Sequence, residues 1–599
     1  MYDRSYGSSG YSPSRLHERG RSDSAAFKKQ KTLAKKILYA LLALLAILFF
    51  FVWLFLGDFR FLLWRYPSLS GFPFGSRTYL VLFQNNYELR PTGGFISSYG
   101  ELTFQSGFYT GMEFYDVYGE IDDHDPAEPP LVLSALLDGE GYQGHTFRDA
   151  NFDPDFRLSK DELVEFYQLT NPETRVDGVL AADFTFLEDL VALYEPLSVE
   201  EYELTKANLF ETLSSVVSDI DRHNEEALAN RKDIAAPLIK KIIFKSLILP
   251  WRLLTVRDLL SQAFEEKHVL AAFNRSGLQK SFNKRGWDGA LPQSDLGDFL
   301  AINEGNYGGM KSDRYLTRDV QYELEVTGQT DVLGNPVMKA HVTVTLSHEG
   351  GFNIPLSGPY TGYLRTMIPI GSNVELGGTV SEDREDVFVL GEMVELQPGE
   401  SVSYSYSYEL PEYVWSDSVY YLHLHKQPGT NDDRYRVIVK LPQGASMSSD
   451  SFEVRENIGF FDSPLTVDTN LSFSILEDEN PPRIVSHELT AMNEITVVFN
   501  EPLNVDHASD PLNFDIIDTN YENADATDEL RIVSIRVDGS AAILTTAGMT
   551  EQVEERYEVV LRGLTDTKGN VIEPNPRSIT VVQRNLEGTI DSEDVAPAE

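Results

Sequence analysis

An uninterrupted apolar run near the N-terminus most constrains what this chain can form. Residues 37–57 carry no charged side chain and lie between Lys36 and Asp58. About 20 apolar residues in a helix, rising about 1.5 Å each, cross a hydrocarbon core about 30 Å thick. A cleaved signal peptide would have a shorter apolar region, followed by small residues at a cleavage site, and residues 55–59 offer no such site. We therefore expect residues 37–57 to form an uncleaved transmembrane helix in a lipid bilayer.

The segment before this run is strongly basic. Residues 1–36 hold nine Lys or Arg side chains against three acidic ones, a net charge of +6. The cytoplasmic flank of a membrane helix typically carries such an excess of Lys and Arg. We expect residues 1–36 to be a disordered basic cytoplasmic tail. The protein would then sit in the cell membrane with its N-terminus cytoplasmic and residues 58–599 extracytoplasmic.

Charge and cysteine content restrict the function of the exported part. The chain has a formal net charge of −43, of which residues 1–36 contribute +6, so residues 37–599 carry −49. Such an acidic surface repels phosphates, so we expect no nucleic-acid partner. The sequence contains no Cys, which excludes disulfides, thiolate nucleophiles and Cys-ligated metals. Ordinary hydrophobic cores must therefore hold the exported domains together.

The periodicity of apolar residues predicts an α/β ectodomain followed by two all-β sandwich domains, after one N-terminal transmembrane helix. Compact apolar runs alternating with amphipathic helices indicate the α/β part. From about residue 319, apolar and polar residues alternate with period two, which predicts antiparallel sheets. A last group of short strands fits an immunoglobulin-like domain of about 100 residues. The expected order is a linker at 58–77, an α/β domain at 78–318, a β-sandwich at 319–475, an immunoglobulin-like domain at 483–585 and an acidic tail at 586–599.

Two stretches of the expected α/β domain, residues 84–95 and 148–156, are denser in polar residues and glycine than packing requires. Arg90 could grip an anion through two parallel N–H bonds, and Gly93 and Gly94 would let backbone N–H groups approach it. Alternatively, Arg90 pairs with an Asp of an ordered loop in which the glycines permit tight turns. The candidate ligand-binding residues are Arg90, Thr92, Gly93, Gly94, Asp116, Arg148, Asp149, Asn151, Asp155 and Lys311.

His423 and His425 lie two residues apart, on one face of an expected strand. Such a pair could ligate a metal ion. The sequence reveals no third ligand, so the alternative is that both histidines are solvent-facing strand residues. Sequence patterns of zinc proteases, serine hydrolases and Walker-loop nucleotide binding are missing.

Several motifs resemble the bacterial Domain of Unknown Function 4012 family, over about residues 78–440. They are residues 79–95, 148–156, 177–183, 267–268, 303–306 with Lys311, 363–365 and 426–430. This resemblance implies a membrane-anchored extracytoplasmic protein without a settled activity. Residues 483–585 separately resemble the bacterial immunoglobulin-like repeats of surface proteins, through residues 498–502 and 565–570.

A more distant likeness is to the LytR–CpsA–Psr envelope enzymes. It rests on the strand before Arg90, on strands that end near Asp116, and on a strand and helix at 176–196. That family moves glycopolymers from a polyprenyl-pyrophosphate carrier to the cell wall, using arginines and a Mg²⁺ held by aspartate. Only Arg90 and Asp116 have plausible matches, so the likeness implies Arg90 at the pyrophosphate and Mg²⁺ at Asp116. Asp149, in the polar stretch 148–156, could also hold a hard cation such as Mg²⁺. The family's later arginine-rich segment has no convincing counterpart before Trp287.

The sequence thus predicts a single-pass, membrane-anchored, extracytoplasmic cell-envelope protein that binds an envelope glycan or a lipid-linked phosphate. One alternative is a LytR–CpsA–Psr-like glycopolymer phosphotransferase with Mg²⁺ as its cofactor, and another is a surface adhesion or scaffold protein. The surroundings of Arg90 distinguish the first two possibilities. A phosphotransferase needs further cations around a lipid-sized groove, whereas a scaffold needs only ion pairing at Arg90.

Overall fold

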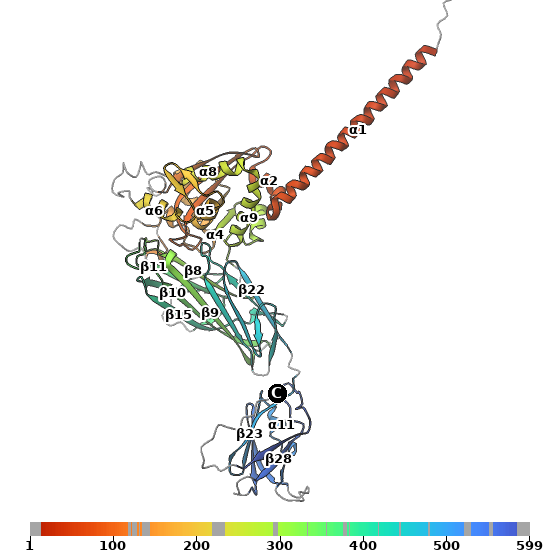
Figure 1. The fold of residues 1–599 in the computed structure, drawn as a ribbon, viewed down its shortest axis with the longest axis vertical. Coiled ribbons are helices and arrows are strands. Elements are labelled where there is room, and N and C mark those ends of the chain that lie inside the picture. The colour runs from red at the N-terminus through yellow and green to blue at the C-terminus, as the bar shows by residue number, and fades with distance from the viewer. Residues whose placement is uncertain are drawn as a thin grey trace, which may run out of the picture. The chain divides into compact units, whose positions relative to one another are not determined.

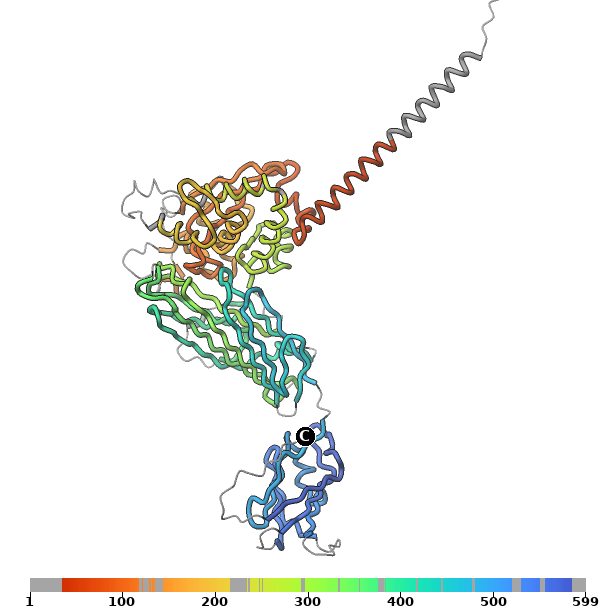
Figure 2. Tube along the Cα trace, viewed as in Figure 1, coloured from red at the N-terminus to blue at the C-terminus, as the bar shows by residue number. Residues whose placement is uncertain are grey.

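The structure is a computed structural model of the chain (Figure 1). It describes residues 14–117, 121, 129–130, 132–134, 144–218, 234–291, 297–331, 334–354, 356–374, 380–382, 384–416, 418–442, 445–476, 480–519, 529–549 and 555–583. The chain divides into two compact units, which Figure 2 traces from the N-terminus. The first contains residues 1–84, 96–124 and 160–289, and the second contains residues 85–95, 125–159 and 290–599.

The expected apolar helix is present near the N-terminus. Helix α1 (Ser14–Leu56) contains all but the last residue of the predicted span. The stretch Lys35–Ser70, to which α1 contributes its apolar half, is long and apolar enough to cross a membrane or to serve as a signal sequence. Helix α1 begins at Ser14, so the prediction that residues 1–36 lack structure is wrong for residues 14–36. Residues 1–13 lie outside the described part of the chain.

The predicted linker at 58–77 is helical over most of its length, which corrects the sequence-based assignment. It forms η1 (Gly57–Phe61) and α2 (Leu62–Ser70). Phe59 is buried, and its ring centroid lies 6.0 Å from that of Phe264 and 5.1 Å from that of Trp287. A solvated linker would not bury such aromatic side chains. Their packing joins this segment to the core of the first unit.

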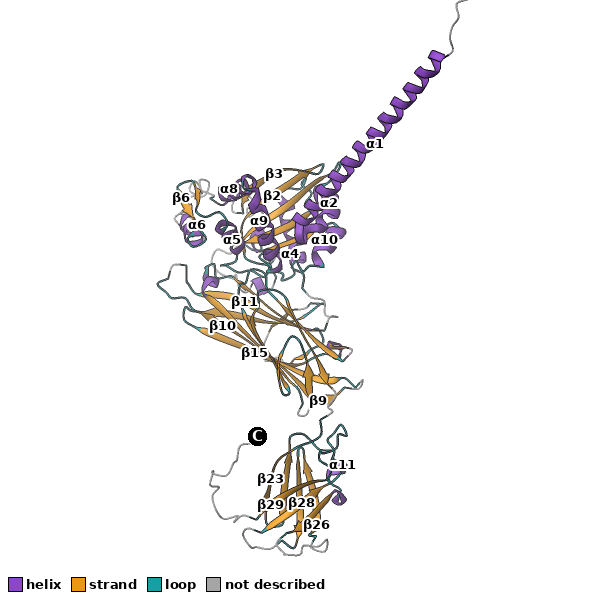
Figure 3. Cartoon of the chain, turned by 45° about the vertical axis from the view of Figure 1, so that its right-hand side comes forward, coloured by secondary structure: helices purple, strands orange, loops and turns teal. Residues whose placement is uncertain are grey.

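A five-stranded mixed sheet forms the centre of the first unit, with helices around it (Figure 3). Its order is β3 (Phe108–Asp116), β2 (Phe95–Gln105), β1 (Ser76–Asn85), β4 (Gly178–Asp183) and β7 (Val269–Phe273). Strands β1 and β4 are parallel, and β4 and β7 are antiparallel. The helices are α4 (Phe156–Thr170), α5 (Phe184–Ala192), α6 (Leu209–Ser218), α8 (Ala235–Ile248), α9 (Leu253–Glu265) and α10 (Ser276–Asn283), with a small hairpin of β5 (Leu197–Val199) and β6 (Tyr202–Leu204). All five residues of β7 are buried, as their unbroken apolar sequence requires.

Two large sheets make up the β-sandwich of the second unit. The first runs in the order β12 (Asn373–Val374), β15 (Ser401–Glu409), β10 (Pro336–His348), β9 (Leu316–Thr330), β18 (Arg434–Lys440), β21 (Ile458–Pro464) and β20 (Glu453–Arg455). The second runs in the order β13 (Val380–Glu382), β14 (Phe388–Leu396), β11 (Tyr360–Ile368), β8 (Asp298–Asn306), β17 (Val419–His425), β22 (Thr469–Leu476) and β19 (Ser446–Ser448), and β16 (Trp415–Ser416) pairs with β17. Apolar side chains of both sheets, such as Leu422 and Val437, share one hydrophobic core.

The predicted boundary at residue 318 is wrong, because β8 belongs to the sandwich. This strand pairs antiparallel with β11 and parallel with β17. Every residue of β8 is buried, including the charged ones. A strand buried on both faces lacks the alternation of apolar and polar residues from which the boundary was predicted. The second unit also takes in residues 85–95 and 125–159, which the sequence assigned to the α/β domain.

The C-terminal residues form two further sheets with their own hydrophobic core. One sheet has the order β23 (Ile484–Ala491), β24 (Glu494–Phe499), β27 (Ala541–Ala547) and β26 (Arg531–Asp538). The other has the order β25 (Phe514–Asp518), β28 (Arg556–Leu561) and β29 (Arg577–Val582). The described residues here are rich in strands, as expected, and also form the short helix α11 (Val505–Ala508). The immunoglobulin-like type of this region stays a prediction. The acidic tail from residue 586 lies outside the described residues.

Candidate functional site

Motifs that are far apart in the sequence meet in one buried polar network of the second unit. Side-chain amides make the connections by donating hydrogen bonds to backbone carbonyls. The Nδ2 atom of Asn86 donates to Gly429 O at 2.8 Å, that of Asn151 to Gly94 O at 2.9 Å, and that of Asn303 to Pro91 O at 2.8 Å. Because a buried backbone carbonyl is costly to leave without a partner, these asparagines fix the loop 85–95 against the sandwich.

The glycines of this loop serve close packing of the backbone. A Cβ atom at Gly94 would lie 2.4 Å from the carbonyl carbon of Asn85, closer than real Cβ contacts. Gly93 has a φ of +130°, which favours glycine. A Cβ atom at Gly429 would lie 2.1 Å from Gly93 O. The polar and glycine-rich composition from which a ligand site was predicted is therefore also what this tight backbone junction requires.

Arg90 is almost completely buried in the same network, with 4% of its surface exposed. Its Nη2 atom lies 3.4 Å from Asp149 Oδ1 and 3.8 Å from Glu88 Oε1. The guanidinium also stacks over the ring of Tyr307, with Cζ 4.2 Å from the ring centroid. Burial is the largest influence and opposes the charge, but Asp149, Tyr307 and Glu88 together outweigh it, so the pKa of Arg90 lies above its ordinary value. The guanidinium therefore has the ion-paired arrangement, while ligand binding by Arg90 stays a prediction.

The other candidate residues divide between the two units. Thr92 is fully buried, and Asp155 pairs with Arg157, Nη2 to Oδ2, at 2.6 Å. Arg148 is about a quarter exposed and lies 3.7 Å from the same Asp149 that pairs with Arg90. Lys311 is partly buried just before η4 (Ser312–Tyr315). Asp116 ends β3 in the first unit and Asp149 lies in the second, and metal binding at either residue stays a prediction.

Sequence reasoning missed a second buried charge cluster, centred on Arg318. Its guanidinium donates to Glu304 Oε1 from Nε at 2.8 Å and to Asp313 Oδ1 from Nη2 at 3.0 Å, and Nη1 lies 3.6 Å from Asp433 Oδ1. Burial raises the pKa of the Glu304 carboxyl to about 7, although Arg318 acts to lower it. A sequence signal was present. Arg318 lies two residues from both Leu316 and Val320, and alternate residues of a strand share one face. Its side chain therefore lies on the buried face of β9.

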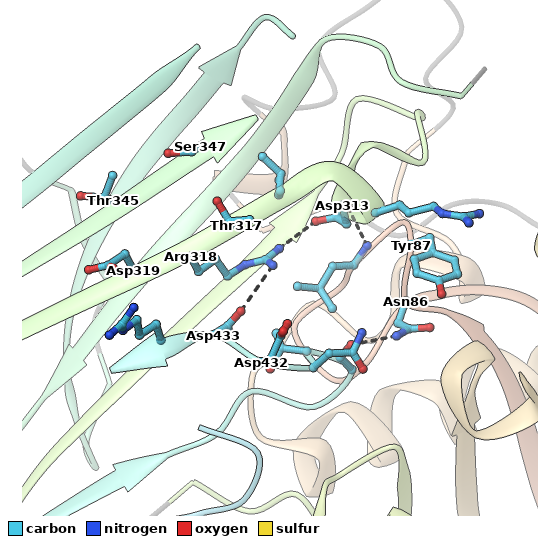
Figure 4. A pocket seen from close by; sticks show the side chains of 17 residues that line it. Asn86, Tyr87, Asp313, Thr317, Arg318, Asp319, Thr345, Ser347, Asp432 and Asp433 are labelled. Atoms are coloured by element: carbon cyan, nitrogen blue, oxygen red, sulfur yellow. Dashed lines mark hydrogen bonds and ion pairs between the residues drawn. The ribbon is translucent and has the colours of Figure 1, made fainter. Parts of the chain in front are cut away.

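A polar pocket adjoins this cluster, with a volume of about 370 Å³ (Figure 4). Figure 4 shows Arg318 between Asp313 and Asp433, with Tyr87 and Asn86 on one side and Asp319, Thr345 and Ser347 on the other. The lining residues are Asn86, Tyr87, Leu89, Asp313, Arg314, Leu316, Thr317, Arg318, Asp319, Thr345, Ser347, Gly429, Thr430, Asn431, Asp432, Asp433 and Arg434. Arg90 and Arg148 are not among them. The pocket therefore draws on residues that sequence reasoning had not proposed.

Acidic side chains slightly outnumber basic ones in the pocket lining. Four aspartates and three arginines line it, and the other lining side chains are mainly hydroxyl and amide groups. Arg434 pairs with Asp462, Nη2 to Oδ2, at 2.7 Å, and Arg318 is held by three carboxylates. Such a surface offers donors and acceptors in many directions without an excess of positive charge.

Comparison with known structures gives short and weak matches. Two structures of the bacterial S-layer protein SbsC, one of its N-terminal part and one of its domains 1–6, are 23% and 24% identical to this chain, with TM-scores of 0.15 and 0.16. Each match covers 18% of this chain, and 24% and 14% of the respective SbsC chains. This chain thus spans a quarter or less of the length of the SbsC structures. An M1 zinc metallopeptidase from Deinococcus radiodurans is 16% identical over 31% of this chain and 47% of its own, with a TM-score of 0.15.

TM-scores this low carry no argument about fold or function. A search of curated proteins found no match. The sequence comparison agrees with the resemblance seen in the motifs, over a shorter range than 78–440. Residues 75–217, which include the Arg90 loop and the residues around Asp149, match the family described as "Protein of unknown function (DUF4012)".

Proposed function

We propose that this protein is anchored in the cell membrane by its N-terminal helix and binds an envelope glycan in the polar pocket of its β-sandwich. The observation that carries the proposal is the pocket's composition. Aspartates, threonines, asparagine and arginine line a volume of about 370 Å³, and Tyr87 stands at its side. This volume is within the range of about 300–1,000 Å³ typical of small-molecule sites.

A glycan suits this lining better than a phosphate does. Sugar hydroxyls both donate and accept hydrogen bonds, so they can use carboxylate, amide and guanidinium groups together. Tyr87 is half-buried, with Arg314 Cζ 5.5 Å from its ring centroid, and adds an aromatic group with a polar tip, a combination common at binding surfaces. A phosphate would need an excess of cations, whereas the lining aspartates outnumber the arginines. The balance of charge therefore favours the glycan over the lipid-linked phosphate.

The phosphotransferase alternative receives less support. Transfer of a phosphoryl group requires cations directed at the developing charge. Arg90, on which that alternative depends, faces Asp149 and Glu88 at 3.4 and 3.8 Å. We therefore propose a binding role and no catalytic one.

The test uses the full-length chain in detergent with soluble peptidoglycan fragments as the probe. Asp432 is an exposed lining residue, so Asp432→Ala should weaken binding at least tenfold without changing thermal stability. Asp450→Ala, at an exposed position away from the lining, is the control and should bind as the wild type does. Equal binding by the two variants, or tighter binding of polyprenyl phosphate than of glycan, would refute the assignment.

A further inference from the structure

Two histidines and an aspartate come together on the face of the eight-stranded sheet that lies opposite the shared core. In the antiparallel pair of β17 and β22, His423 lies opposite Asn470 and Leu424 opposite Thr469. Continuing this register by one residue places His425 opposite Asp468. Leu422 and Leu424 belong to the sandwich core, so residues 423 and 425 project from the other face. The strand pairing thus supplies the third ligand that the sequence alone did not reveal.

We propose that His423, His425 and Asp468 form a binding site for a divalent transition metal of the zinc type. Each residue contributes one ligand atom, and the three atoms lie within 4.8 Å of one another. His425 Nδ1 lies 3.6 Å from Asp468 Oδ1. Two ligand atoms on a tetrahedral zinc, with bonds of about 2.0–2.2 Å, are about 3.3 Å apart. Small side-chain rotations therefore bring the three ligands to bonding distance.

Neighbouring groups hold two of these ligands as in known zinc sites. His423 Nδ1 lies 2.7 Å from Asn470 Oδ1, so an N–H at Nδ1 donates to the amide oxygen and Nε2 is the ligand atom. The backbone N–H of Lys426 donates to Asp468 Oδ1 at 2.8 Å and fixes the carboxylate. Metal-bound histidines usually donate their other ring N–H in this way, which sets both tautomer and orientation.

The ligand set indicates which ion the site takes. Imidazole nitrogens suit Zn²⁺ and similar borderline ions, whereas Mg²⁺ and Ca²⁺ take oxygen ligands. Three protein ligands leave one position on a tetrahedral ion for water or an anion. The segment 426–433 begins directly after the ligand His425, and its residues 429–433 line the polar pocket. A bound metal would therefore steady one wall of that pocket.

The test measures Zn²⁺ binding to the full-length chain in detergent, after chelator treatment and dialysis, by calorimetry. Substitution with Co²⁺ reports the coordination geometry through its visible absorption. The wild type should bind one Zn²⁺ that Mg²⁺ does not displace, and Co²⁺ should give the intense bands of a tetrahedral site. Since His423 is partly exposed, His423→Ala and His423→Gln should keep the fold but weaken this binding more than about 100-fold. Asn470→Ala should weaken it about tenfold.

A second strand histidine provides the matched control. His341 on β10 is exposed and bonds through Nδ1 to Ser407 Oγ at 2.8 Å, so His341→Ala should leave Zn²⁺ binding unchanged. The proposal is overturned if the wild type binds no Zn²⁺. It is equally overturned if both His423 variants bind as tightly as the wild type, or if His341→Ala removes the binding instead.

Discussion

Removing the charge of Arg90 should open the loop 85–95 while leaving the rest of the chain folded. The guanidinium is 4% exposed, and its Nη2 atom lies 3.4 Å from Asp149 Oδ1. Arg90→Met keeps an apolar stem but leaves Asp149 buried without this cation. Breaking a buried ion pair from one side typically costs about 3–5 kcal/mol. We expect a loss of this size in the local stability of the loop.

The conservative variant separates charge from shape. Arg90→Lys keeps the positive charge, but an ammonium cannot both pair with Asp149 and cover the ring of Tyr307, over which Cζ now lies at 4.2 Å. A desolvated cation–π contact contributes about 2 kcal/mol. The expected order of local stability is therefore wild type, then Arg90→Lys, then Arg90→Met.

Hydrogen exchange of the full-length chain in detergent measures this directly, because it reports the opening of individual segments. A loss of about 3 kcal/mol raises amide exchange about 100-fold, since about 1.4 kcal/mol corresponds to a factor of ten. Arg455, whose side chain is 69% exposed in its pair with Glu453, provides the control, and Arg455→Met should leave the exchange of its segment unchanged. If Arg90→Met leaves exchange in 85–95 at the wild-type rate but removes ligand binding, the structural role argued for Arg90 is refuted.

Three further perturbations test other parts of the fold. Burial raises the pKa of Asp298 to about 7, so the folded state binds this proton more tightly than the unfolded state does. The free energy of unfolding should therefore fall by up to about 4 kcal/mol from pH 4 to pH 7. Asp298→Asn should flatten this pH dependence in thermal melts. Gly94→Ala places a Cβ 2.4 Å from Asn85 and should cost about 1–3 kcal/mol, whereas Gly111→Ala, with nothing within 4 Å, should be neutral in the same melts. Phe59→Ala should destabilise the first unit by about 3–5 kcal/mol, seen as earlier unfolding by Trp287 fluorescence.

The sequence predicted those parts of the fold that follow from local periodicity. The apolar helix, the strand before Arg90 and the alternating strands after residue 319 are present where expected. In each case neighbouring residues along the chain carry the whole signal. The helix at 62–70 was missed because so short a segment carries little periodicity. Its Leu62 and Leu69 pack against a core that includes Trp287, far along the chain.

The domain boundary could not be predicted from local patterns. Strand β8 is apolar at its start and then reads Asn303-Glu304-Gly305-Asn306, which resembles a loop. It is a strand because Arg318 pairs with Glu304 and the side chain of Gln427 bonds to the backbone on both sides of residue 304. These partners lie on β9 and in the segment just after β17, so propensity at the site itself could not reveal them.

The same logic explains why the candidate site was placed at Arg90 and not in the pocket. A loop rich in Arg, Asn and Gly meets the requirements of an anion site and of a buried backbone junction equally well, because both need satisfied polar groups and close approach of the main chain. What separates them is whether the side chains face solvent. Arg90 and Asn151 face inward onto Asp149 and Gly94, whereas Asp432 and Thr317, in unremarkable sequence, remain exposed at the pocket. Exposure depends on the tertiary fold. The polar stretches therefore supply buried support, and the pocket combines Asn86, Tyr87 and Gly429 from such stretches with plainer neighbours such as Asp432.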